Sequence, residues 1–380
     1  MSRRVTLRCL PSIMDKIQSG LTAAMAATAG LHKSKPKRPD PQQDGKNTLP
    51  LSFCPDAKSR VKIATAKAPE IEASHLAIGA WSWGEKGTWQ WKNEEMTSLK
   101  EAIKLLLDHG INFIDTAEVY GGGKSEEIVG ELIADLPRES VVVQTKWHVL
   151  PLTANNLLHS ADAPVRALRG SLERMKLGYV DVYLVHGHIH LQSIPTVAKA
   201  LAECVRQGMA RAVGVANYDF EDFVKMRKEL ARYDVPLAAN QCEYNVLRRY
   251  PEVQGHISAY REMDVVFQSY SSLAQGRLTG KYSKQNPPPA TRRFSNYDMA
   301  SVEPALRTLE DVAKNRGKSV AAVALNYNLS KGALPVVGIR NPAQAKQAVE
   351  ALGWRLDTKE VEMIDRHSFE GKATMFWQQA

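Results

Sequence analysis

Short apolar runs rich in β-branched residues alternate with longer amphipathic segments along most of the chain. Runs of four to eight apolar residues bounded by polar or turn-forming residues are typical of buried strands. From about residue 75 onward the sequence predicts eight such strands, at residues 75–80, 111–115, 141–146, 180–186, 212–217, 237–243, 265–270 and 335–338.

The amphipathic segments between these runs predict helices. They span residues 97–110, 125–136, 164–178, 196–208, 219–232, 251–263, 304–329 and 341–352. Eight strands, each followed by a helix, predict a (β/α)8 TIM barrel, whose active site is built at the carboxyl ends of the strands. A doubly wound open sheet is the alternative, but the first turn, GAWSWG at residues 79–84, lacks the G-x-G-x-x-G spacing of a phosphate fingerprint.

The first 60 residues differ in composition from the rest. The net charge is +9, but residues 1–40 hold eight basic and two acidic residues, which leaves +3 for residues 41–380 and does not favour nucleic-acid binding. The polar stretch HKSKPKRPDPQQDGKN buries too little apolar surface to order itself. We therefore predict a targeting peptide and disordered linker at residues 1–60, dispensable for folding and activity, and the barrel at residues 61–380. A plain disordered tail and a secretory signal around LTAAMAATAGL are the alternatives.

Composition excludes several other classes. Hydrophobic residues make up 44% and charged residues 24%, so collagen-like, coiled-coil and wholly disordered chains are excluded. The four cysteines form no C-x-x-C pair, which favours a reducing compartment. The best apolar segment, residues 17–31, is shorter than the roughly 20 residues of a membrane span and is diluted by polar residues, so we expect no transmembrane helix.

Polar side chains stand where the predicted strands end, as a barrel active site requires. Asp115 ends the second strand and Lys146 ends the third, so the two are expected to form an ion pair at the mouth. Tyr120 follows Asp115 by five residues. The Lys146 ammonium is expected to lower the pKa of the Tyr120 phenol from about 10, which would make Tyr120 a general acid.

His186 ends the fourth strand and could donate a hydrogen bond to a carbonyl oxygen from the side opposite Tyr120. The alternating histidines His186, His188 and His190 also suggest a zinc site, but the later strand ends supply no further His or Asp ligand, so we expect no metal. The loop GGGKS at residues 121–125 lacks the first glycine of a phosphate-binding loop.

The later strand ends suit a flat ligand with an amide and phosphates. Asn217 and Gln241 offer amides for pairing with a carboxamide, and Tyr270 offers a ring for stacking. Arg340 stands at the start of the last helix, where free backbone N–H groups and a guanidinium favour an anion.

Seven motifs of the chain resemble, in order and spacing, the signatures of the aldo/keto reductases. They are FIDTAEVYG, VVVQTKW, YLVH, VGVANY, NQCEYN, SYSSLAQGRLTGKY and VVGIRNPAQ. The resemblance covers about residues 70–365 and is strongest to the plastid-targeted plant and algal branch, which is related to channel β-subunit-like reductases.

The resemblance implies a role for each residue that matches a motif. Tyr120 would donate the proton, Asp115 and Lys146 would tune it, and His186 would orient the carbonyl. NADPH would bind across the barrel mouth. Asn217 and Gln241 would hold its carboxamide, and Tyr270 would stack on the nicotinamide. Ser271, Leu273 and Lys281 would follow the pyrophosphate. Arg340 and Gln344 would meet the adenosine end, and Gly338 is also expected to bind the cofactor.

The chain departs from the family pattern at two places. Ala216 stands where a serine often precedes the carboxamide-binding asparagine, and Gln347 with Ala348 stands where Glu-Asn is common near the adenine. The first change removes a hydroxyl contact, and the second affects the expected affinity for the cofactor.

The sequence thus predicts an NADPH-dependent oxidoreductase that reduces an aldehyde or ketone, located in the chloroplast. An NADPH-sensing regulatory subunit with slow turnover is the alternative function, and the mitochondrion or cytoplasm the alternative location. The aromatic residues of the first loop, Trp81, Trp83, Trp89 and Trp91, and of the tail, Phe376 and Trp377, either line an apolar pocket or seal the barrel. The identity of the substrate and the choice between monomer and homo-oligomer stay open.

Overall fold

The structure, a computed structural model, describes residues 36–149 and 153–374. Residues 1–35 of the predicted targeting peptide and linker, and the tail residues Phe376 and Trp377, lie outside the described residues. None of the helices in the described ranges is long and apolar enough to cross a membrane.

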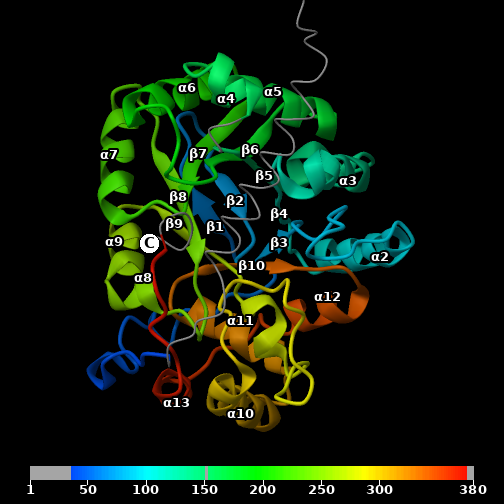
Figure 1. Cartoon of the computed structure of the whole chain (residues 1–380), viewed down its shortest axis with the longest axis vertical. Helices are drawn as coiled ribbons and strands as arrows, with labels where there is room; N and C mark the ends of the chain where they lie inside the picture. The colour runs from blue at the N-terminus through cyan, green and yellow to red at the C-terminus, as the bar shows by residue number, and fades with distance from the viewer. Residues whose placement is uncertain (1–35, 150–152, 375–380) are drawn as a thin grey trace, which may run out of the picture.

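Eight parallel strands close into a barrel surrounded by helices (Figure 1). They are β3 (Ala77–Gly79), β4 (Phe113–Asp115), β5 (Val142–Trp147), β6 (Val180–Val185), β7 (Ala210–Ala216), β8 (Leu237–Glu243), β9 (Val266–Tyr270) and β10 (Leu334–Gly338). Strand β10 pairs with both β9 and β3, which completes the ring. The predicted (β/α)8 TIM barrel is confirmed, and each predicted apolar run overlaps one barrel strand.

The helices that follow the strands match most of the predicted segments. They are α2 (Glu95–Asp108), α3 (Lys124–Ile133), α5 (Ala163–Met175), α6 (Ile194–Arg206), α7 (Phe220–Ala231), α8 (Tyr250–Val253), α9 (His256–Glu262), α10 (Met299–Arg316), α11 (Val320–Ser330) and α12 (Pro342–Val349). The single helix predicted over residues 304–329 is wrong. The chain breaks there at Gly317, whose φ of 62° is left-handed, and the Ser319 side chain caps the next helix.

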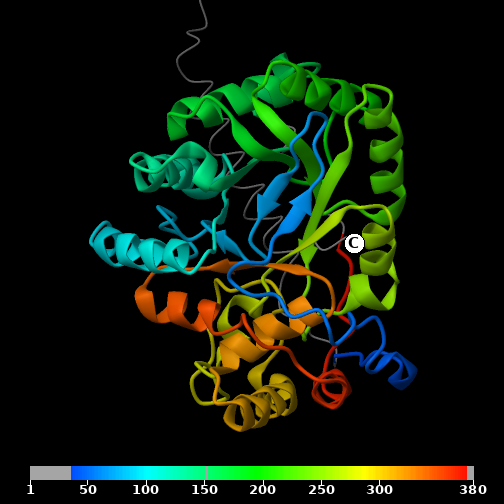
Figure 2. The same ribbon diagram turned by 180° about the vertical axis from the view of Figure 1, so that it is seen from behind.

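Two helices and a two-stranded hairpin were not predicted. Helix α4 (Ala154–Leu158) and helix α13 (Thr358–Arg366) lie outside the barrel repeat, and strands β1 (Val61–Ile63) and β2 (Ile71–Ala73) form an antiparallel hairpin. The hairpin lies across the amino end of the barrel (Figure 2), where Ile63 and Ile71 join one apolar cluster with Phe113. It closes this end of the barrel, so the opposite end is left for a site.

Side chains along β5 point alternately toward the surrounding helices and into the barrel. Val143 and Trp147 pack in the apolar layer beneath the helices, whereas Val142 joins the cluster at the amino end of the barrel. Gln144 and Lys146, in phase with Val142, hydrogen-bond to residues of other strands inside the barrel. Successive strand residues point to opposite faces, so one strand contributes both to the core and to the site.

Residues 36–60 lie against the barrel, which differs from the disordered linker expected there. Beneath them is a buried ion cluster formed by Arg249, Glu252, Lys331 and Asp365. The Lys331 ammonium donates to the Lys46 carbonyl over 2.9 Å, and the Gly45 amide donates to Asp365 over 2.9 Å. The segment has few apolar side chains, and it is held to the barrel by backbone groups that satisfy buried charges. Composition alone therefore did not indicate that it is ordered.

Deleting residues 1–60 is therefore expected to lower the unfolding free energy by more than about 2 kcal/mol, because charged groups of the buried ion cluster would lose hydrogen-bond partners. Deleting residues 1–35 removes none of these contacts and serves as the control. Chemical denaturation of the two shortened proteins measures the difference. Equal stability would show that residues 36–60 contribute nothing.

Candidate active site

The side chains of Asp115, Tyr120 and Lys146 meet at the carboxyl end of β4 and β5. The Lys146 ammonium lies 2.7 Å from an Asp115 carboxylate oxygen and 3.3 Å from the Tyr120 hydroxyl, and it donates to the Thr116 carbonyl over 2.9 Å. Lys146 is fully buried and Asp115 almost so. The expected ion pair is present, and it lies within hydrogen-bond distance of the phenol.

A tight turn brings Tyr120 back over the pair. It begins the short 3-10 helix η2 (Tyr120–Gly123), in which Gly121 and Gly122 have left-handed φ values of 58° and 65°. A Cβ at Gly121 would lie 2.9 Å from the backbone of Gly84, so a larger residue would push the turn away from the first loop. The two glycines therefore allow the phenol to reach Lys146.

Two glutamines complete the surroundings of Asp115. Gln144 and Gln241 donate their amides to the same carboxylate oxygen over 2.6 and 3.2 Å, and both also donate to Gln268 over 2.8 Å. Sequence reasoning named Gln241 but missed Gln144 and Gln268. Both interrupt apolar strand runs, at VVVQTKW and VVFQSY, and that interruption was the available signal.

Burial dominates the electrostatics of this group. The pKa of Tyr120 is raised well above 10 by desolvation and, secondarily, by the Asp115 charge. The pKa of Lys146 is lowered by desolvation, and the Asp115 charge opposes that shift. The expected lowering of the Tyr120 pKa is therefore corrected, because desolvation outweighs the neighbouring ammonium. The phenol is protonated at neutral pH, as a proton donor must be.

His186 lies beside the phenol, as expected. Its ring meets the Tyr120 ring edge to face with centroids 5.6 Å apart. Burial lowers the pKa of His186 well below 6.5, and the positive Lys146 lowers it further, so the imidazole is neutral. A neutral imidazole can donate one hydrogen bond, which suits the polarisation of a carbonyl oxygen.

The other two histidines of the run turn away from His186. His188 lies 3.1 Å from the Asn217 carbonyl, and the His190 ring contacts Gln192 and Tyr218. Within residues 36–149 and 153–374, no group of three His, Cys, Asp or Glu side chains is arranged to hold a metal.

The amides predicted to bind the cofactor lie close to Asp115 and His186. Asn217, whose φ of 58° is left-handed, donates to the His186 carbonyl over 3.2 Å and accepts from the Tyr270 hydroxyl over 2.9 Å. The Tyr270 ring packs edge to face against Phe294 with centroids 5.3 Å apart. These contacts hold Asn217 and Tyr270 together on one wall.

One cavity of 1720 Å³ joins these groups. Twelve of the thirteen predicted site residues line it, and Lys146 lies just beneath its surface. Gln347 and Ala348, the departures near the expected adenine position, line it as well. The cavity is larger than the roughly 300–1,000 Å³ of an ordinary ligand pocket, so it has room for a dinucleotide and a substrate.

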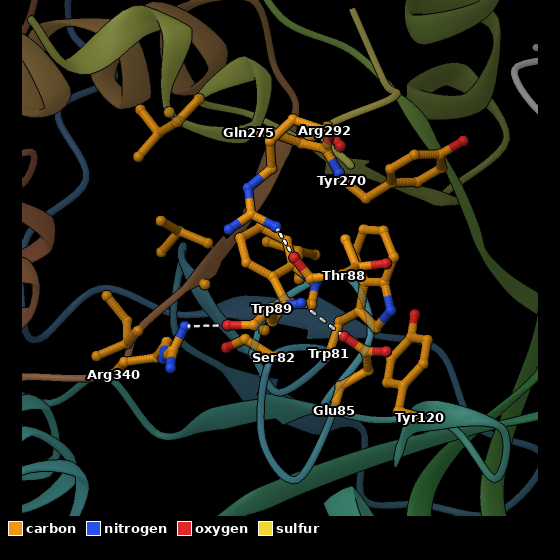
Figure 3. A pocket seen from close by; sticks show the side chains of 18 of the residues that line it. Trp81, Ser82, Glu85, Thr88, Trp89, Tyr120, Tyr270, Gln275, Arg292 and Arg340 are labelled. Atoms are coloured by element: carbon orange, nitrogen blue, oxygen red, sulfur yellow. Dashed lines mark hydrogen bonds between the residues drawn. The ribbon is translucent and has the colours of Figure 1, made fainter. Parts of the chain in front are cut away.

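Arg340 lies in this cavity but is already paired (Figure 3). Its guanidinium forms a two-pronged ion pair with Glu95, which sequence reasoning missed, and donates to the Trp89 carbonyl over 2.9 Å. The Gln344 side chain accepts from the Arg340 backbone amide over 2.7 Å. The Gln344 backbone amide donates to the side chain of Asn341, which caps α12. The expected anion site therefore contains its own counter-charge.

The tryptophans of the first loop divide into two roles. Trp81 and Trp89 line the cavity with their rings 5.4 Å apart, and the Arg292 guanidinium lies 3.7 Å above the Trp89 ring (Figure 3). Trp83 is fully buried and donates to the Ile339 carbonyl over 2.7 Å. The loop thus both lines the pocket and seals the barrel, and Arg292 and Phe294 are pocket residues that the sequence did not indicate.

A turn after β9 completes the wall where a phosphate arm was expected. Ser271, Leu273 and Lys281 line the cavity there, around the 3-10 helix η4 (Ala274–Thr279). The Gln275 side-chain amide nitrogen is buried with no hydrogen-bond partner in the described part of the chain, while its oxygen accepts from the Phe294 amide. A buried donor of this kind suits a ligand with acceptor oxygens.

Comparison with known proteins indicates the family to which the chain belongs. The family model for the aldo/keto reductases matches residues 75–368. A chloroplastic pyridoxal reductase of Arabidopsis thaliana is 30% identical over 325 residues, covering 81% of this chain and 87% of the relative. A probable potassium channel β subunit of rice is 32% identical over 270 residues, covering 68% of this chain and 80% of its own length.

Among solved structures, a glycerol dehydrogenase of Gluconobacter oxydans superposes with a TM-score of 0.68 at 29% identity. The match covers 81% of this chain and 94% of the dehydrogenase. The barrel, the strand-end residues and the family match over most of the chain agree. The chain belongs to the aldo/keto reductase family of oxidoreductases.

Proposed function

We propose that the protein reduces an aldehyde or ketone to an alcohol with NADPH, and that Tyr120 donates the proton. The observation that carries the proposal is the Tyr120 hydroxyl, 3.3 Å from the Lys146 ammonium and beside the neutral His186 ring, in a cavity large enough for a dinucleotide. An NADPH-sensing subunit would not need this arrangement, although a channel β subunit is among the relatives.

When bound, NADPH supplies the hydride that adds to the carbonyl carbon. His186 donates a hydrogen bond to the carbonyl oxygen and fixes its position, and Tyr120 transfers its proton to that oxygen as negative charge develops there. The transfer leaves a phenolate next to Lys146, whose ammonium stabilises it. Asp115 keeps Lys146 charged and in place.

The cofactor is assigned to the wall formed by the late strands. Asn217 and Gln241 would hold the carboxamide, and Tyr270 would stack on the nicotinamide once its hydroxyl leaves Asn217. Ser271, Leu273 and Lys281 would bind the pyrophosphate. The adenosine end would be bound by Gly338, Arg340 and Gln344, which all line the cavity.

The substrate end is aromatic. Trp81 lies 6.1 Å from the Tyr120 ring and 5.9 Å from the Phe294 ring, measured between centroids, so a small carbonyl compound beside the phenol would contact aromatic walls. The pyridoxal reductase among the relatives makes pyridoxal the first compound to assay.

A plastid location fits the chloroplastic relative and the composition of residues 1–60. A fluorescent protein fused to the carboxyl end of the full chain is expected to enter plastids of a plant cell, whereas the same fusion without residues 1–35, which keeps the contacts of residues 36–60, should stay outside. Equal distribution of the two fusions would contradict the proposal.

The substitution Tyr120→Phe removes only the hydroxyl, so carbonyl reduction should fall by about 10²–10⁴-fold while NADPH still binds. Turnover and the quenching of tryptophan fluorescence by NADPH measure the two effects. Tyr233→Phe, which alters an exposed tyrosine far from the site, is the matched control and should change neither. Retained turnover in Tyr120→Phe would favour the sensing function.

Lys146→Met should impair the same proton transfer, because the phenolate would lose its neighbouring cation. The double variant should then lose much less than the product of the two single losses. Fully multiplicative losses would mean that the two residues act on different steps.

Cofactor preference is expected to depend on the Arg340–Glu95 pair. Arg340→Ala should weaken NADPH binding by about 1.5–3 kcal/mol and NADH binding little, because only NADPH carries a 2′-phosphate for the guanidinium. Glu95→Gln should strengthen NADPH binding, since it removes the competing carboxylate. Fluorescence titration with both cofactors measures the constants, and equal changes for both would reassign Arg340 to a structural role.

A further inference from the structure

A second histidine lies next to His186, and the mechanism above does not use it. His148 follows the last residue of β5, lines the cavity and is 7% exposed. Its ring centroid is 6.3 Å from that of His186, with the planes 68° apart. It therefore faces the same end of the cavity as the proposed proton donor.

The backbone of His148 is held firmly. Its N–H donates to the half-buried Glu118 carboxyl, and its carbonyl accepts from the Asn156 side chain over 3.0 Å. Asn156 also accepts from the neighbouring Trp147 indole over 3.0 Å. These contacts use the main chain and leave the imidazole available.

The imidazole of His148 has no hydrogen-bond partner on either nitrogen within the part of the chain that the structure describes. Burial lowers its pKa to about 4, so the ring is neutral and carries one donor and one acceptor. An unpaired buried polar group lowers the stability of the folded protein, and a group left in that state beside a ligand cavity is suited to pair with a ligand.

We propose that His148 is a specificity-determining residue that binds a hydroxyl group on the carbon next to the substrate carbonyl. The proposal rests on the proposed function, in which His186 and Tyr120 hold the carbonyl oxygen. Two adjacent imidazoles can then hold two oxygen atoms carried by adjacent carbons of one substrate. A hydroxyl matches His148 because it both donates and accepts a hydrogen bond, as the neutral ring does.

A site built to bind a hydroxyl discriminates against the analogue that lacks it, because its buried polar group is then unpaired. The proposal therefore concerns selectivity within the same reduction rather than the chemical step. It identifies the preferred substrates as α-hydroxy aldehydes and α-hydroxy ketones.

The test compares isosteric substrate pairs in which a hydroxyl replaces a methyl group: glycolaldehyde with propanal, and α-hydroxyacetophenone with propiophenone. His148→Phe keeps a ring of similar size and removes both nitrogens. It should lower kcat/KM about 3- to 10-fold for the hydroxylated member of each pair, the usual worth of one hydrogen bond, and less than 2-fold for the other. Since each substrate is compared between enzyme variants, differences in hydration of the carbonyl groups cancel.

Two measurements separate specificity from structure. His148→Gln restores a donor and an acceptor and should recover most of the lost selectivity. His148→Phe should not lower the melting temperature, because the imidazole makes no hydrogen bond with residues 36–149 or 153–374. Equal losses for both members of each pair, or a lowered melting temperature with unchanged selectivity, would overturn the proposal.

Failure of the proposed function has a different signature. In that case, the wild-type protein would reduce none of the four compounds, nor pyridoxal and 4-nitrobenzaldehyde, although NADPH quenches its fluorescence. Reduction of 4-nitrobenzaldehyde with no preference for either hydroxylated compound would contradict only the role given to His148.

Discussion

The ion pair between Asp115 and Lys146 is the constraint on which the site depends. Both side chains are inside the barrel, where neither charge is tolerable without the other, so removing one partner would leave an uncompensated buried charge. The pair also links β4 to β5 and gives Tyr120 a fixed neighbour at 3.3 Å. Gln144 and Gln241 bind the same carboxylate, so residues of three strands share one charge. The barrel is therefore the scaffold of the site and also the environment that keeps its charges paired.

Burial favours the neutral form of three titratable side chains at this end of the barrel. It raises the pKa of Tyr120 and lowers the pKa of His186 and His148, so all three are neutral at physiological pH. Neutral groups can donate hydrogen bonds without attracting water or counter-ions into the cavity. Lys146 is the exception, because Asp115 holds its charge. The site thus combines one fixed ion pair with several neutral donors.

The sequence predicted the barrel because apolar runs and amphipathic segments report local burial, and it predicted Asp115, Lys146 and His186 because polar residues ending apolar runs are conspicuous. It did not predict the Arg340–Glu95 pair or the Arg292–Trp89 stack, since partners separated by about two hundred residues or more leave no local pattern. Nor did it show that residues 36–60 are ordered. Their polar composition matches that of a disordered chain. Their order is explained by the buried ion cluster beneath them, which no local pattern reveals.

The loop between β3 and α2 reaches both ends of the cavity because of how the barrel closes. Strand β3 lies between β4, which carries Asp115 of the proposed catalytic group, and β10, which precedes the proposed adenosine site. Accordingly Trp81 lies beside Tyr120, whereas the Trp89 carbonyl binds Arg340. A change in this loop therefore acts on the substrate wall and the cofactor wall together. Ring closure, rather than any single motif, makes the first loop the segment where the two halves of the site are coupled.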